Sequence, residues 1–201
     1  MNHGMLMGSG KQVETPTTNR LIFDGSDLWK VPAGVFRVLV TMWGAGGGGG
    51  TSNPNGPSAG GGGGGFTRKW VDVCPGELIE VIVPVKPHPA ANGTAARFGN
   101  YAYADGGFAG CGTNTYGTGG VGETENGANG GPMVNSGGTL GGYGGAAGGT
   151  AFGGGAATAN TPDPNFTPGY NGNFPGGGGS GGNDSYIDGG FGSAGRVIVE
   201  W

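Results

Sequence analysis

The chain has 201 residues, of which 55 are glycine and 13 are proline, while only 11% are charged and the formal net charge is −4. So much glycine usually indicates a low-complexity segment, but disorder driven by charge repulsion needs a high net charge and is excluded. No strict Gly-x-y period runs through the sequence, so it is not a collagen. The longest apolar run, residues 35–43, contains Arg37 and is much too short to span a bilayer, so no membrane insertion is expected.

Apolar side chains are concentrated in three windows, residues 20–43, 66–85 and 195–201. Most of the leucine, isoleucine and valine residues lie there, together with the four tryptophans, which we expect to be core-structural residues: Trp29, Trp43, Trp70 and Trp201. These windows predict a small β core within one domain of residues 20–201. Residues 1–19 have few apolar groups apart from methionines and are predicted to form an N-terminal attachment arm.

The first window predicts two short elements and one long strand. Residues 21–23 form a short strand candidate, and residues 29–34 are expected to be extended and to end in a turn. Residues 35–43 are β-branched and aromatic, which favours a strand. Because side chains alternate along a strand, its buried face is predicted to carry Phe36, Val38, Val40 and Met42.

The second window predicts a hairpin of two strands, residues 66–73 and 78–85. Between them lies Cys74-Pro75-Gly76-Glu77, in which proline followed by glycine suits a type II turn. One face of the second strand is expected to carry Ile79, Val81, Val83 and Val85. Residues 196–201 form the last strand, with Val197, Val199 and Trp201 on one side. No apolar period of 3.6 residues has useful length, so the fold class is all-β with almost no α-helix.

Two long glycine-rich loops, residues 44–65 and 86–194, separate these strands. A flexible linker is one interpretation, but so long a structureless loop inside one domain is implausible, and the second loop carries all 6 tyrosines. Polyproline-II helices have three residues per turn and no internal hydrogen bonds, so their backbone groups can bond to neighbouring helices. The spacing of Gly138, Gly141 and Gly144 fits this period. We predict that the loops pack as polyglycine-II helices.

Few residues in the sequence suit catalysis or cofactor binding. Its histidines are His3 and His88, and Glu123 and Glu125 are the only close acidic pair in the glycine-rich region; we expect both glutamates to face solvent. We therefore predict that the protein is not an enzyme and has no cofactor. Acidic residues at 184 and 188 offer too few ligands for a cation site, so no metal is expected.

The cysteines and the charge pattern exclude two further classes. Cys74 and Cys111 are too few for a cysteine-based zinc site; they fit free thiols, and whether they pair stays open. Between Arg97 and Arg196 there is no lysine or arginine, while six acidic residues occur there. Nucleic-acid binding depends on positive charge that neutralises phosphate, so no nucleic-acid partner is expected.

Aromatic residues within polar, glycine-rich loops are the best candidates for recognition. Tyrosine with asparagine, serine and glycine is typical of adaptable binding surfaces. The candidate receptor-binding residues are Tyr101, Tyr103, Tyr116, Phe166, Tyr170, Phe174 and Tyr186. The alternative, that aromatic rings cover the glycine layers from outside, carries equal weight for Tyr143 and Phe152. It carries less for Tyr170 and Phe174, whose Pro- and Asn-rich surroundings favour a tip.

Several motifs occur in an order that resembles a known family. They are residues 29–35 (WKVPAGV), 42–48 (MWGAGGG), the glycine run that enters Phe66, 73–78 (VCPGEL), 97–99 (RFG) and 189–199 (GGFGSAGRVIV). Over residues 20–201 the chain resembles the glycine-rich receptor-recognition (adhesin) domain at the tips of bacteriophage tail fibres, including adhesins of T-even-like phages. It departs from the family at residues 84–89, where a proline-rich stretch replaces a glycine-rich turn.

The resemblance implies a β-structure with stacked polyglycine-II helices and variable distal loops that contact the host surface. It implies a virion protein of the tail fibre or baseplate, made in the host cytoplasm. Its partners would be a bacterial surface receptor, a glycan or an outer-membrane protein, and other fibre or baseplate chains. The family favours a homotrimer; a monomer that caps another fibre protein is the alternative assembly.

Three other functions stay open at this stage. The chain can be a structural tail or baseplate component without direct receptor contact. An ice-binding polyglycine-II protein would also be rich in glycine, although the irregular glycine spacing counts against it. A glycan-cleaving enzyme on a fibre is the third alternative.

Overall fold

A computed structural model describes residues 19–51, 58–112, 115–132, 134–135, 139–140, 142, 144–155, 168–182 and 187–201. The elements in chain order are β1 (Arg20–Phe23), β2 (Asp27–Lys30), β3 (Arg37–Trp43), β4 (Phe66–Asp72), β5 (Leu78–Ile82), β6 (Ala96–Phe98), β7 (Ala102–Ala104), β8 (Val134–Asn135), β9 (Thr139–Leu140), the 3₁₀ turn η1 (Thr150–Phe152) and β10 (Arg196–Glu200). The fold is all-β, as predicted, and the described residues contain no α-helix.

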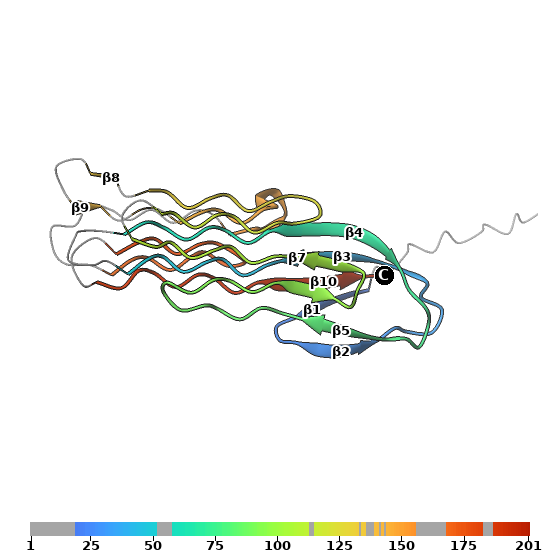
Figure 1. The fold of residues 1–201 in the computed structure, drawn as a ribbon. Coiled ribbons are helices and arrows are strands. Elements are labelled where there is room, and N and C mark those ends of the chain that lie inside the picture. The colour runs from blue at the N-terminus through green and yellow to red at the C-terminus, as the bar shows by residue number, and fades with distance from the viewer. Residues whose placement is uncertain are drawn as a thin grey trace, which may run out of the picture.

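Two antiparallel sheets form the core (Figure 1). The first has the strand order β1-β10-β3-β4, and the second has the order β2-β5-β6-β7. Buried side chains from both sheets make one cluster, in which Trp29 contacts Phe98 and Trp201 with ring centroids 5.9 and 5.5 Å apart. The predicted alternation holds at the centre of this core, where these residues are buried: Val38, Val40, Met42, Ile79, Val81, Val197 and Val199.

The predicted hairpin is wrong, although its turn is correct. The Glu77 N–H donates to the Cys74 carbonyl at 3.0 Å and Gly76 has a φ of 85°, as a type II turn requires. However, β4 pairs with β3, whereas β5 pairs with β2 and β6. The turn thus carries the chain from one sheet to the other. Local turn chemistry sets the reversal, but contacts distant in sequence decide the partners.

Three predicted core residues are exposed instead. Phe36 precedes β3 and Val85 follows β5, so neither continues the inward alternation, and 67% and 76% of their surfaces are accessible. Trp70 lies on β4 next to Val71, which points into the core, so its own side chain faces outward and is 56% exposed. The loop predicted at 86–194 also contains β6 and β7, whose alanines gave no strong strand signal.

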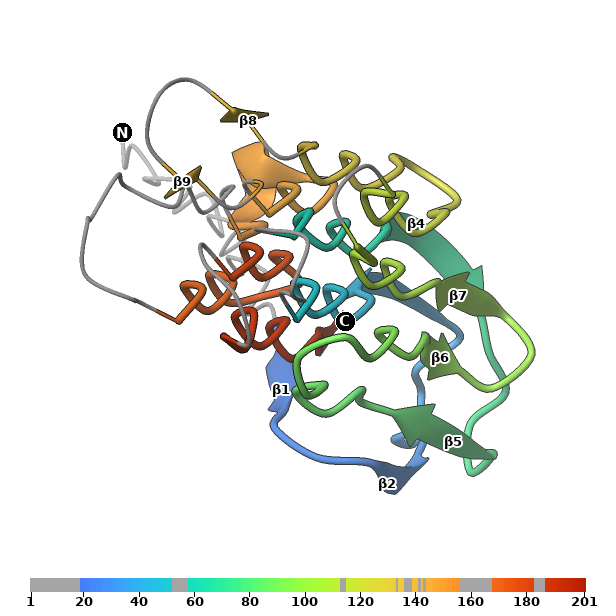
Figure 2. The same cartoon turned by 60° about the vertical axis from the view of Figure 1, so that its left-hand side comes forward.

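Glycine-rich segments extend from the sheets as a bundle of parallel and antiparallel rods (Figures 1 and 2). One rod, residues 44–50, continues β3, and another, residues 58–65, leads into β4. Backbone N–H groups of rod 58–65 point in three directions with a period of three residues, at N···O distances of 2.7–3.1 Å. Residues 58, 61 and 64 donate to 182, 179 and 176; residues 59, 62 and 65 donate to 112, 108 and 105; residues 60 and 63 donate to 131 and 128.

The carbonyls of rod 58–65 accept bonds from three further segments, which lie within residues 44–50, 117–120 and 142–148. The rod is therefore bonded to six neighbours through its backbone alone. A helix with three residues per turn projects its groups in this way, and we interpret the bundle as packed polyglycine-II helices.

This packing leaves no space for side chains at most inner positions. A Cβ atom at Gly49 would lie 1.8 Å from the Ser180 carbonyl oxygen, and one at Gly63 would lie 1.9 Å from that of Ala146. Alanine occurs within the bundle at 45 and 59, where the small side chain is fully buried. At the edge of the bundle, asparagine side-chain oxygens accept backbone N–H groups in place of a neighbouring rod, as Asn92, Asn126, Asn129 and Asn171 do.

The molecule has two distinct ends. At the end formed by the sheets, called the base here, Asn19 and Trp201 exchange two backbone hydrogen bonds of 2.9 and 3.0 Å. The first and last described residues thus lie together at the base. The opposite end, where the rods terminate, is called the distal end.

Candidate binding site

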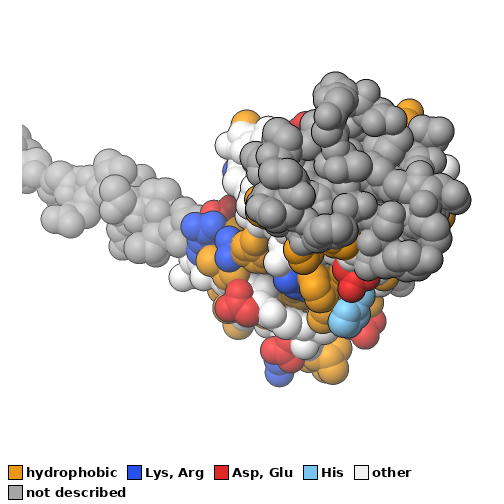
Figure 3. All heavy atoms as spheres, turned by 90° about the vertical axis from the view of Figure 1, so that its left-hand side faces the viewer, with side chains coloured by type: hydrophobic (Ala, Val, Ile, Leu, Met, Phe, Trp, Pro, Cys, Tyr) orange, Lys and Arg blue, Asp and Glu red, His pale blue; other side chains and the backbone are white. Residues whose placement is uncertain are grey.

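The distal end is the candidate binding site, because several described rods reach it and carry exposed aromatic side chains there. Described rod residues at this end include 51, 58, 112, 115, 132, 142, 182 and 187. Strands β8 and β9 also lie at this end, and Figure 3 looks onto it. The described ends of the rods are therefore held in place by backbone hydrogen bonds.

Two of the predicted receptor-binding residues belong to this end. Tyr116 precedes Gly117, whose N–H donates to the Gly60 carbonyl. The Tyr170 carbonyl accepts from the Ser180 N–H. The two tyrosines are 41% and 46% exposed. Phe166 and Tyr186 lie outside the described residues, as does Tyr143.

Three other predicted residues lie elsewhere. Tyr101 and Tyr103 belong to the β6–β7 hairpin of the second sheet. Tyr101 is the last residue of the turn that joins these two strands, since its N–H donates to the Phe98 carbonyl. Phe174 lies where the rods meet the sheets, and the Arg196 guanidinium is 4.5 Å from its ring centroid. The predicted tip position of Phe174 is therefore wrong. The predicted set does not form one surface, because chain reversals occur at both ends of the rods and look alike in sequence.

Hydrogen bonds hold the backbone around Tyr170 rigidly. The Tyr170 N–H donates to Ser180 Oγ at 2.7 Å, and the Ser180 N–H donates back to the Tyr170 carbonyl at 2.9 Å. Nearby, Thr51 Oγ1 donates to Asp188 Oδ1 at 3.3 Å, and the Gly169 N–H donates to the Asp188 carbonyl at 2.9 Å. An exposed aromatic ring on a fixed backbone loses little entropy when it binds a partner.

The candidate acidic pair has structural partners. Glu123 accepts from Lys69 Nζ at 2.5 Å and from the Tyr103 N–H at 3.0 Å, while Glu125 accepts from the Gly149 N–H at 2.8 Å. Both residues are exposed, yet their carboxylates bond the turn at 122–125 to its neighbours.

Among described residues there is no group of three or more metal-ligating side chains. Cys74 and Cys111 are free and exposed. Of the acidic residues considered for a cation, Asp184 lies outside the described residues.

Among the described residues, the resolved pKa shifts belong to Glu77 and Tyr101 at the base. The Tyr101 hydroxyl donates to Glu77 Oε1 at 2.6 Å, and the Cys74 N–H donates to Glu77 Oε2 at 3.1 Å. These bonds stabilise the carboxylate, so the Glu77 pKa is lowered, first by Tyr101 and then by the Cys74 amide. The same bond raises the Tyr101 pKa, because ionisation of the phenol would remove the donor.

Glu77→Gln should move the Tyr101 pKa back toward its usual value, which an NMR titration of the ring would measure. At pH values above the ordinary carboxyl pKa, the hydrogen bonds to ionised Glu77 stabilise the folded protein. This stabilisation is lost as the pH falls through the lowered Glu77 pKa. At pH values below the ordinary phenol pKa, the hydrogen bond from the Tyr101 hydroxyl stabilises the folded protein. This stabilisation is lost as the pH rises through the raised Tyr101 pKa. An unchanged Tyr101 titration in the variant would contradict the bond. Because both groups are exposed, we expect little change in overall stability.

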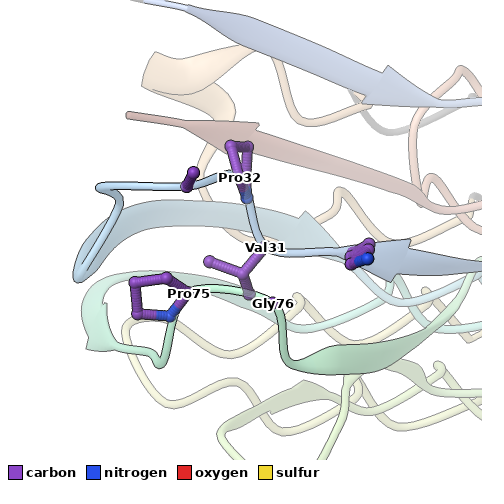
Figure 4. A pocket seen from close by; sticks show the side chains of 6 residues that line it. Val31, Pro32, Pro75 and Gly76 are labelled. Atoms are coloured by element: carbon purple, nitrogen blue, oxygen red, sulfur yellow. The ribbon is translucent and has the colours of Figure 1, made fainter.

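A shallow hollow at the base lies between residues 30–33 and the turn at 75–76 (Figure 4). Val31, Pro32 and Pro75 line it, and the Gly76 N–H donates to the Val31 carbonyl at 2.9 Å. Its one ionisable side chain is Lys30, so the described lining contains no acid–base pair.

In the described part of the chain, no helix has the length and apolar character needed to cross a membrane. Comparison of the sequence with protein-family models finds no match, and comparison with curated proteins finds none either.

Proposed function

We propose that the protein is a receptor-binding adhesin of a bacteriophage tail fibre, which recognises a bacterial surface receptor during adsorption. The proposal makes it a virion protein that is not an enzyme, attached through its base to other tail fibre or baseplate chains. The observation that carries the proposal is the polarity of the molecule. The first and last described residues lie together at the base, while the rods carry Tyr116 and Tyr170 toward the opposite end.

The rods suit this function because they hold the binding residues at the distal end, away from the base through which the protein would attach to the virion. Backbone bonds to several neighbours fix their positions without a large apolar core. Residues at the distal end can therefore differ in sequence without loss of the scaffold. Several copies on one virion, as in the homotrimer that the resemblance favours, would convert weak contacts into strong adsorption.

Adsorption competition tests the proposal directly. Purified protein, added in excess to host cells before the phage that carries this chain, should occupy the receptors and slow phage adsorption. Thermally unfolded protein is the control for non-specific effects. Normal adsorption in the presence of a large excess of folded protein would overturn the proposal.

Tyrosines at opposite ends should respond differently in this competition. The double variant Tyr116→Ala, Tyr170→Ala should compete about tenfold less well, because aromatic anchors commonly contribute more than about 1 kcal/mol each to an interface. Tyr101→Ala is the matched control, since it removes an exposed tyrosine at the base. Equal loss of competition in the two variants would contradict the distal position of the site, even if the protein is an adhesin.

A further inference from the structure

The outer face of the first sheet carries a hollow that the proposed function does not use. Its volume is about 400 Å³, and it is lined by Leu39, Arg68, Lys69, Trp70, Thr124 and Phe152. Leu39 and Trp70 are direct partners across β3 and β4. On the rod side, the Phe152 ring stacks on Phe66 with an interplanar angle of 11° and a centroid distance of 5.3 Å. The lining of the hollow thus combines one aliphatic and two aromatic side chains.

Both aromatic side chains are about half exposed, at 56% for Trp70 and 52% for Phe152. The Arg37 guanidinium lies 5.5 Å from the Trp70 ring centroid, yet Arg37 is not among the residues that line the hollow. At 56% exposure, Trp70 stays accessible to a ligand although Arg37 lies beside its ring.

Arg68 supplies a cation without a described counter-ion. Its guanidinium carbon is 4.8 Å from the Phe152 ring centroid. Among described residues, neighbouring cations are paired, Arg37 with Asp72 at 3.4 Å and Lys69 with Glu123 at 2.5 Å, but Arg68 forms no ion pair. A guanidinium stacked on a ring keeps its in-plane N–H donors available, and their fork matches a carboxylate or phosphate.

The backbone under Arg68 is fixed. Its N–H donates to Thr124 Oγ1 at 2.8 Å, and that hydroxyl donates to the Arg68 carbonyl at 3.2 Å. Arg68 also lies in the middle of β4, where Thr41 is its partner on β3. Arg68 and Trp70 are thus carried by the same strand, β4, which pairs with β3 along its length.

We propose that this hollow binds an acidic sugar, with the sugar ring against Trp70 and its carboxylate or phosphate bound by Arg68. The apolar C–H face of a sugar suits the electron-rich face of an indole, and the volume falls in the range of small-ligand sites. A single uncompensated cation is too little for a nucleic-acid backbone. The site lies on the side of the sheets and is independent of the distal end.

Binding should be measured by calorimetry and tryptophan fluorescence with trigalacturonate as the carboxylate probe and glucose 6-phosphate as the phosphate probe. Maltotriose is the neutral control. Trp70 is the tryptophan most exposed to solvent, so an occupied hollow should protect it from iodide quenching. We expect at least one acidic probe to bind and maltotriose to bind about tenfold more weakly, since a charged hydrogen bond contributes roughly this factor.

Arg68→Gln should weaken the acidic probe about tenfold, and Trp70→Ala should abolish both binding and the quenching change. Arg97→Gln on the other sheet is the matched control and should bind normally; thermal unfolding checks that each variant is folded. Equal binding of acidic and neutral sugars, no binding of either acidic probe, or an Arg68 variant that binds normally would each overturn the proposal. A Trp70→Ala variant that sediments as a smaller species than the wild type would overturn it in favour of a contact between copies of this chain.

Discussion

Replacing Gly63 by alanine should prevent folding or destabilise the protein by at least about 3 kcal/mol, because overpacking against a backbone that cannot move exceeds the usual cost of an added methyl group. The new Cβ would lie 1.9 Å from the Ala146 carbonyl oxygen. The Gly63 N–H donates to Ala128, and its carbonyl accepts from Gly120. Relief of the clash would therefore break bonds to other rods. Chemical denaturation with circular dichroism would measure the loss.

Two matched variants separate this clash from a general effect of composition. Gly25→Ala adds the same methyl group where no atom lies within 4 Å and φ is outside the left-handed region, so stability should stay within about 0.5 kcal/mol of the wild type. Ala59→Gly removes a buried methyl group from the same rod as Gly63 and should cost about 1 kcal/mol. A Gly63→Ala variant as stable as Gly25→Ala would show that rod 58–65 is not packed as described.

Backbone amides of rods 44–50 and 58–65 should exchange with solvent as slowly as those of β3. Each described N–H in these rods has a carbonyl partner on another segment, so exchange requires the bundle to open. For a domain of ordinary stability, this predicts slowing by at least about a thousandfold relative to a free peptide. Hydrogen exchange followed by NMR would measure it, with the Gly25 region as an exposed reference.

Exchange in these rods at the rate of a free peptide would contradict the bundle, even if the strands were protected. Comparing exchange in the rods with exchange in the strands is informative, because the entropy cost of ordering a rod residue and the free energy of its hydrogen bond are similar in size. Ordering one backbone residue costs about 1–2 kcal/mol, and one hydrogen bond returns about 0.5–1.5 kcal/mol net. A rod alone would therefore not stay ordered. It depends on close contact with its neighbours and on strands β3 and β4, which hold its ends in register.

Much of the sandwich could be predicted from local patterns in the sequence. The alternation of Val38, Val40 and Met42 identifies β3 because an extended backbone projects successive side chains to opposite faces. Pro75 and Gly76 identify a type II turn because they suit its dihedral angles. These are properties of a few adjacent residues, so they do not depend on the rest of the fold.

The candidate site could be predicted only in part. Tyr116 and Tyr170 were found because aromatic residues in glycine-rich loops favour a binding surface, and both are near the distal end. Phe174 has the same local character but lies against Arg196 near the sheets. No periodicity in a glycine-rich stretch tells at which end of a rod the chain reverses.

The sequence alone determined the all-β class, the positions of the main strands and the turn at residues 74–77, because short-range sterics and side-chain alternation control them. Only the tertiary structure decided that β4 and β5 belong to different sheets, that Trp70 faces outward and that rod 58–65 lies at the centre of the bundle. These features depend on hydrogen bonds and contacts between residues far apart in the chain. Glycine has no side chain to indicate which partner its backbone will meet.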